Sequence, residues 1–276
     1  MRNLIKLILN AGILSIISFY ELPYHPIKAK DNIRISANKE NILNIDAAES
    51  LTLNTNIKIG KLSRAIEKAL NSRDINKLTE FLERNLLMEI EQKFSTFIQE
   101  FPNAKWVVKP QGTLKDKRHV MTLSVTAQKK KDFHSYKLEA KQKLALDIKE
   151  GKVKNYEIID EYSILKTTNQ PIDISLEIPS TALTGSWYEI DIIINKPLES
   201  SIIAGSLMLL EESQKNVIFK DSLELKPMGS GGLFKLVKAP LNPGIQTWAA
   251  LIAHPDGIIS ITKRVRIISE SESIDL

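Results

Sequence analysis

The spacing of apolar residues changes abruptly at Pro102. Between Lys61 and Pro102 apolar residues recur every three or four positions, which predicts amphipathic helices. After Pro102 they alternate with polar residues at a period of two, which predicts half-buried strands. Helices followed by a run of strands indicate an α+β fold, in which an antiparallel sheet curves over the helices and covers their apolar faces.

The helical part predicts three helices. The first starts at Lys61 and stops near Asn71. Asp74 is predicted to cap the second helix, because its carboxylate can accept the free backbone N–H groups at a helix start. The third is predicted from Leu86 to Phe101. The strands that follow are predicted at 106–114, 120–128, 136–148 and 153–165, with a tight turn at Glu150–Gly151 before the last.

Residues 61–166 resemble the cone-shaped family named after nuclear transport factor two. The run from Ala65 to Asp74 looks like the helix-Asp-helix opening of this family, and residues 150–162 are similar to its closing hairpin. The resemblance implies a curved antiparallel sheet wrapped around three helices. It does not imply one function, since the same cone hosts enzymes, binding modules and association domains.

Enzymes of this family place a carboxylate inside the cone as a general base. In this chain the catalytic candidates are Asp160 as the base, with Tyr156 or Tyr162 as hydrogen-bond donor. The alternative interpretation places Asp160 at the surface or rim of the sheet. The sequence contains no zinc, phosphate-loop, dinucleotide or nucleophile-elbow motif, so neither a metal nor a cofactor is expected.

The net charge of +5 hides an uneven distribution. Residues 102–168 carry 15 basic and eight acidic side chains, whereas residues 169–276 carry nine and 13. Lys137, Lys141 and Lys143 share one strand face, which indicates either a surface for an anionic partner or a plain solvated face. The mild net charge and the lack of interleaved aromatic residues disfavour nucleic acid as the partner.

Residues 171–268 predict a second, all-β domain after a polar break at 167–171. Seven short apolar segments separated by turn signals predict a sandwich, with a two-residue hairpin turn at Asp256–Gly257. The segment Leu241–Trp248 is similar to the entry to the penultimate strand of immunoglobulin-like modules, although it lacks their corner tyrosine. Trp187 and Trp248 are expected in the core, and residues 269–276 are expected to form a flexible acidic tail. The predicted strands are 172–178, 187–194, 203–210, 216–225, 233–237, 245–254 and 258–268.

The N-terminus has the pattern of an export signal. Arg2 and Lys6 precede an apolar run, and Ala29 ends a plausible cleavage site, so residues 1–29 are predicted to form a signal helix. Two alternatives stay open: an uncleaved anchor that associates with the membrane through residues 4–20, and a buried helix of a cytosolic protein. Residues 30–60 are expected to be a linker. The absence of cysteine agrees with an oxidising compartment such as the periplasm or an equivalent lumen.

These patterns together predict an exported envelope protein that binds rather than catalyses. Its expected partners are an envelope protein or a small apolar ligand held in the cone domain. A homodimer through the outer face of the sheet is a further expectation. The alternative is an isomerase or dehydratase that uses Asp160 as its base.

Overall fold

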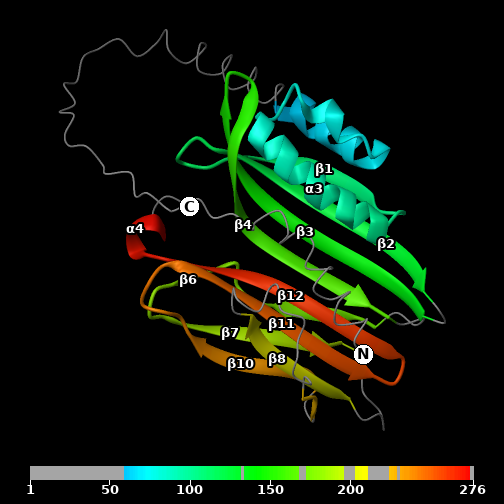
Figure 1. The fold of residues 1–276 in the computed structure, drawn as a ribbon. Helices are drawn as coiled ribbons and strands as arrows, with labels where there is room; N and C mark the ends of the chain where they lie inside the picture. Colours follow the sequence, from blue (N-terminus) through cyan, green and yellow to red (C-terminus); the bar gives the residue numbers. More distant parts are fainter. Residues whose placement is uncertain are drawn as a thin grey trace, which may run out of the picture.

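The computed structural model describes residues 59–131, 134–167, 172–195, 203–210, 224–228 and 231–273. Most of these residues lie in β-strands, and the helices are concentrated at the N-terminal end (Figure 1). The α+β, β-rich class that the sequence predicts is therefore confirmed. The predicted signal helix of residues 1–29, including Ala29, and almost all of the predicted linker lie outside the described residues.

The first and third of the three predicted helices are present, but the prediction of the second helix is wrong. Residues 59–72 are helical, and α3 spans Arg84–Glu100. Between them is only η2, a single 3-10 turn at Ile75–Leu78, and Asp74 makes no capping hydrogen bond there. Its carboxylate instead pairs with Lys77 at 3.1 Å. The helix cannot continue because the backbone of residues 81–83 hydrogen-bonds to Val153 at the start of the last strand of the meander.

The four predicted strands form an antiparallel meander. They are β1 (Lys105–Thr113), β2 (His119–Lys131), β3 (His134–Lys149) and β4 (Lys152–Lys166). The turn between β3 and β4 is Glu150–Gly151, as predicted, and both residues have positive φ angles of 53° and 79°. Figure 1 shows the helices lying across one face of these strands.

The sheet does not end at β4. Strand β12 (Gly257–Ile268) pairs with β4, and it is followed by β11 (Gly244–His254), β8 (Ala204–Leu210) and β9 (Lys226–Pro227). The short β6 (Thr181–Leu183) pairs in parallel with the end of β12. The sequence predicts two modules, at 61–166 and 171–268, yet strands from both are hydrogen-bonded into one nine-stranded sheet.

The pairing of β4 with β12 runs from Ile259 opposite Lys166 to Arg264 opposite Glu161. Side chains reinforce it: Ser163 and Thr262 share a hydrogen bond of 2.6 Å, and Lys263 forms an ion pair with Asp160. Further along, the Glu157 carboxylate accepts a hydrogen bond from Arg118 at 2.5 Å and another from Arg266 at 2.6 Å. Backbone and side-chain contacts therefore join the two halves continuously.

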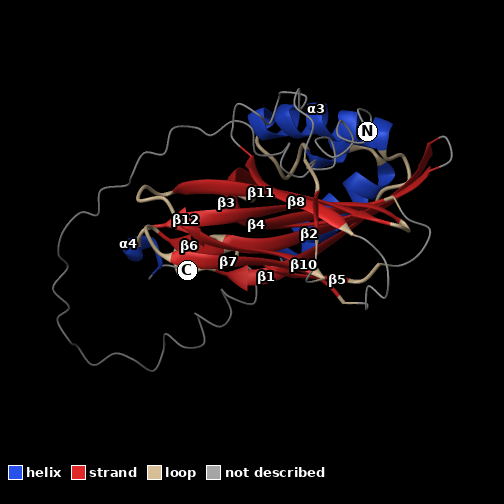
Figure 2. Ribbon diagram, turned by 90° about the horizontal axis from the view of Figure 1, so that it is seen from below, coloured by secondary structure: helices blue, strands red, loops and turns tan. Residues whose placement is uncertain are grey.

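A second sheet contains β10 (Gly232–Lys238), β7 (Trp187–Ile194) and β5 (Ile174–Glu177), in that order. It packs on the face of the large sheet opposite the helices, as Figure 2 shows, with α3 on one side and β5, β7 and β10 on the other. Register places Ile261 and Ile164 on this face, and both belong to the apolar core beneath the second sheet. The two faces of the large sheet are thus covered at different ends.

Trp248 is in the core as predicted, but the expectation for Trp187 is wrong. Trp248 is 4% exposed, and its indole N–H donates to the Tyr188 hydroxyl at 2.8 Å. Trp187 is 61% exposed. Strand alternation explains the difference, because Tyr188, Ile190 and the other even-numbered residues of β7 point toward the large sheet and force Trp187 outward.

Three further details differ from the sequence-based expectation. His254 pairs with Gly257, so the two residues of the β11–β12 turn are Pro255 and Asp256 rather than Asp256 and Gly257. Residues 270–273 of the predicted flexible tail form a short helix, α4 (Glu270–Ser273). The strand predicted at 216–225 falls almost entirely outside the described residues.

We expect the two halves to unfold in one transition. Because β4 and β12 are paired, unfolding of either half would expose the edge strand of the other half to solvent. Trp106 reports on the helix-covered half, and Trp248 reports on the second. In the variants Trp187→Phe/Trp248→Phe and Trp106→Phe/Trp187→Phe, the fluorescence transition in urea should coincide with the far-ultraviolet circular dichroism transition. A fluorescence change that follows only one step of a two-step dichroism curve would contradict the shared fold.

Candidate ligand-binding cavity

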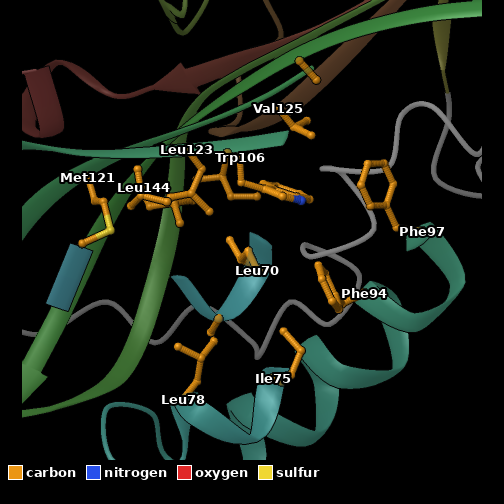
Figure 3. Packing of buried hydrophobic residues seen from close by; sticks show 14 of the residues in the cluster. Leu70, Ile75, Leu78, Phe94, Phe97, Trp106, Met121, Leu123, Val125 and Leu144 are labelled. Carbon is orange, nitrogen blue, oxygen red and sulfur yellow. The ribbon is translucent and has the colours of Figure 1, made fainter. Parts of the chain in front are cut away.

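A cavity of about 80 Å³ lies between the helices and the concave face of β1–β4. Its walls are almost wholly apolar. The helices contribute Leu70 and Phe94, and the sheet contributes Met121, Leu123 and Leu144, all of which Figure 3 shows facing the space between the two layers. Apolar cavities of roughly 150 Å³ stay dry and bind benzene-sized molecules, so this one suits a smaller apolar group.

The sequence places these side chains by simple periodicity. In α3, Leu86, Ile90 and Phe94 are four residues apart and therefore lie on one helix face. In β3, Leu144 and Leu146 are two apart and share the sheet face that points toward that helix. The cavity arises where helical and strand periods bring apolar faces together without filling the space between them.

Strand β1 is an edge of the sheet, and the first helix holds it in place. The Asn71 side chain donates to the carbonyl of Trp106 and accepts from its backbone N–H, each at 2.9 Å. Glu67 accepts from the backbone N–H of Val108 at 2.8 Å. These bonds satisfy backbone groups that an edge strand would otherwise expose, and they fix the position from which the Trp106 ring enters the cavity wall.

Trp106 carries an unpaired donor in this apolar wall. Its side chain is 4% exposed, and its indole Nε1 has no hydrogen-bond partner. The rings of Phe97 and Phe94 lie at 5.3 Å and 6.2 Å from the indole, the former edge-on. Figure 3 shows the indole between the sheet and the helices. A buried N–H without an acceptor costs about 1 to 3 kcal/mol, so an acceptor that entered the cavity would recover part of that energy.

One end of the cavity is polar. Tyr156 and Lys93 both line it, and both interact with Glu89 on α3: the tyrosine hydroxyl donates at 3.5 Å, and the lysine forms an ion pair. Burial, and next the negative charge of Glu89, raise the pKa of Tyr156. Tyr156 is therefore a neutral hydroxyl at physiological pH, and the methylene stem of Lys93 adds to the apolar wall.

The structure does not bring the three catalytic candidates together. Tyr156 lines the cavity, but Asp160 and Tyr162 lie on the opposite face of the sheet, which follows from their register with Lys143 and Lys141. Asp160 is paired with Lys263, whose side chain is 8% exposed. The Tyr162 hydroxyl donates to Glu139 at 3.4 Å. A bulge between Lys143 and Leu144 changes which residues of β4 face inward, and sequence periodicity does not reveal it.

The structure brings the three candidate binding lysines together. Lys137, Lys141 and Lys143 lie on the outer face of β3, away from the helices, and Lys137 and Lys141 are exposed. Across β2, register places Lys105 and Lys109 of β1 on the same face, since they pair with Thr126 and Thr122. Sequence reasoning missed these two lysines because they belong to a different strand.

Sequence reasoning also missed Trp106, Glu89 and Lys93 as site residues. Alternation identifies Trp106 as a buried strand residue, but nothing in the sequence indicates that its N–H lacks an acceptor. Among the residues that the structure describes, no group of three or more metal-ligating side chains occurs. No helix in the described part of the chain reaches the length and hydropathy of a membrane span.

Residues 169–268 match a family model described as a domain of unknown function (DUF8623). The match covers 100 of the 276 residues and ends with β12, the strand that pairs with β4. No curated protein matches the chain.

We expect Asp160 to serve stability rather than chemistry. Asp160→Asn leaves Lys263 buried without its counter-charge and should lower the free energy of unfolding by about 2 to 4 kcal/mol in urea denaturation. In the double variant Asp160→Asn/Lys263→Met, most of that loss should be recovered, since no buried charge remains.

Cavity binding should be unchanged in Asp160→Asn, measured below the unfolding transition with the small ketone acetone as the probe. A folded Asp160→Asn protein that no longer binds the probe would show that Asp160 contributes to the binding site.

Proposed function

We propose that this chain is an exported binding protein whose cavity takes a small, mostly apolar molecule with one hydrogen-bond acceptor. The observation that carries the proposal is the buried, unpaired N–H of Trp106 in a wall that is apolar apart from the end formed by Tyr156 and Lys93. Ketones, aldehydes, esters and ethers have the required combination of an apolar body and one neutral acceptor oxygen. Small-molecule sites commonly consist of such walls with a few placed polar groups.

The proposal includes the family resemblances. The described helices on one face of the β1–β4 meander support a cone of the nuclear transport factor two type at 61–166. The second sheet packed against β8, β11 and β12 supports an immunoglobulin-like sandwich at 171–268. The sandwich would serve as a spacer or as the surface for an envelope protein partner, because interaction is a common use of such modules.

Export is proposed from the N-terminal sequence. Residues 1–29 would direct the chain to the periplasm or an equivalent lumen, with cleavage after Ala29 or retention through residues 4–20. The competing isomerase or dehydratase function receives no support from the described geometry, because Asp160 lies on the far side of the sheet from the cavity and is paired with Lys263.

A matched ligand pair tests the binding site. Acetone and isobutane have the same number of heavy atoms and similar shapes, and both are smaller than benzene, but only the ketone offers an acceptor. Trp106→Phe should weaken the binding of acetone about five- to tenfold and leave the binding of isobutane nearly unchanged in a nuclear magnetic resonance titration, because one hydrogen bond contributes about 1 kcal/mol.

Leu144→Phe serves as the control for location, since a larger side chain in the cavity should weaken both ligands. Equal weakening of both ligands by Trp106→Phe would show that the indole acts through shape alone. Failure of the wild-type protein to bind either ligand would overturn the proposed site.

Export is tested by N-terminal sequencing of the protein purified from the cell envelope of its own host. Cleavage should give a mature chain that begins at Lys30. An intact N-terminus in the membrane fraction would identify an anchor instead, and an intact chain recovered entirely from the cytosol would contradict export.

A further inference from the structure

The outer face of the second sheet carries large apolar side chains that are exposed to solvent. Register places Trp187 and Glu189 of β7 beside Lys238 and Leu236 of β10 on this face, and Phe234 follows two residues along. Trp187, Leu236 and Phe234 are 61%, 59% and 53% exposed. Soluble domains rarely present a Trp, a Phe and a Leu together unless the surface is used for binding.

Carboxylates surround this apolar group. Glu189 lies between the exposed rings on β7, Asp191 pairs with Phe234 across the sheet, and Glu177 pairs with Asp191 from β5. Among the described residues of β5, β7 and β10, register places one cation, Lys238, on this surface together with the three carboxylates. We call the set the aromatic face: Trp187, Phe234, Leu236, Glu177, Glu189 and Asp191.

The outer face of β1–β3 has the opposite character. Its lysines stand in rows on β1 and β3, with Glu139 among them and Val107, 45% exposed, on β1. We call this set the lysine face: Lys105, Lys109, Lys137, Lys141 and Lys143. A second copy of the lysine face would repel it, so two molecules cannot pair lysine face to lysine face without a large electrostatic cost.

Both faces point to the same side of the molecule. The lysine face belongs to the first layer, and the aromatic face is the outside of the second layer, which covers β4, β12, β11 and β8 but not β1–β3. Packed sheets are about 10 Å apart, so the two faces form a step of that height. Figure 2 shows β5, β7 and β10 on the side opposite the helices.

We propose that two copies of this chain form a dimer in which the aromatic face of each copy packs on the lysine face of the other. A two-fold axis along the step brings both pairs of faces together at once, which closes the dimer and leaves neither surface free. The carboxylates of one copy then lie opposite the lysines of the other. Trp187 and Phe234 pack on the partner's Val107 and on the methylene groups of the partner's lysines. This inference is independent of the ligand proposed for the cavity.

Charge exchange tests the proposal directly. Analytical ultracentrifugation of the mature chain should show a monomer–dimer equilibrium whose dissociation constant rises with added sodium chloride, because charge pairs at an interface are screened by salt. Lys141→Glu and Glu189→Lys should each raise the dissociation constant about tenfold or more, since each places like charges opposite one another. The double variant Lys141→Glu/Glu189→Lys should recover most of the affinity.

Two controls separate this result from general effects. Lys68→Glu makes the same charge change on the exposed side of the first helix and should leave the dissociation constant unchanged. Trp187→Ala should also weaken the dimer, while thermal melts show that each variant is folded. A wild-type protein that stays monomeric at about 100 μM would overturn the proposal. A dimer that persists in both single charge variants would overturn it as well.

A membrane surface is the other candidate for the lysine face. If the monomer sediments with vesicles that contain phosphatidylglycerol and Lys141→Glu abolishes that binding, while no dimer forms, then the face binds lipid and self-association is wrong.

Discussion

The pairing of β4 with β12 is the interaction on which the rest of the structure depends. It makes one sheet out of strands that are about 100 residues apart in sequence, and it aligns Ser163 with Thr262 and Asp160 close to Lys263. Because one sheet has two faces, the helices occupy one face at the β1–β4 end, and the second sheet occupies the other face at the β12–β8 end. The step between the two layers is a consequence of this offset.

Much of the fold follows from sequence periodicity. The change at Pro102 predicts helices before strands, and the four strands of the meander lie within a few residues of their predicted positions. Periodicity failed where long-range backbone bonds decide the outcome. The helix expected after Asp74 is replaced by a single turn because residues 81–83 bond to Val153. Trp187 was expected inside because a tryptophan is usually buried, whereas alternation with Tyr188 turns it outward.

The candidate site was less predictable than the fold. The residue types that suggest catalysis, Asp160 with Tyr162, are on the wrong face for the cavity because a bulge in β3–β4 reverses the alternation. The residue that matters most for the proposed ligand, Trp106, is an ordinary core tryptophan in the sequence. Its unpaired N–H is a property of its neighbours, Phe94 and Phe97, which fill the surroundings with carbon rather than with acceptors.

The central claim is that the cavity receives an acceptor at Trp106, and the indole N–H signals in a ¹H–¹⁵N spectrum test it most directly. Saturating acetone should move the Trp106 signal downfield, as a new hydrogen bond requires, while isobutane should not and the signal of exposed Trp187 should stay in place. An unmoved Trp106 signal in the presence of bound ketone would contradict the account.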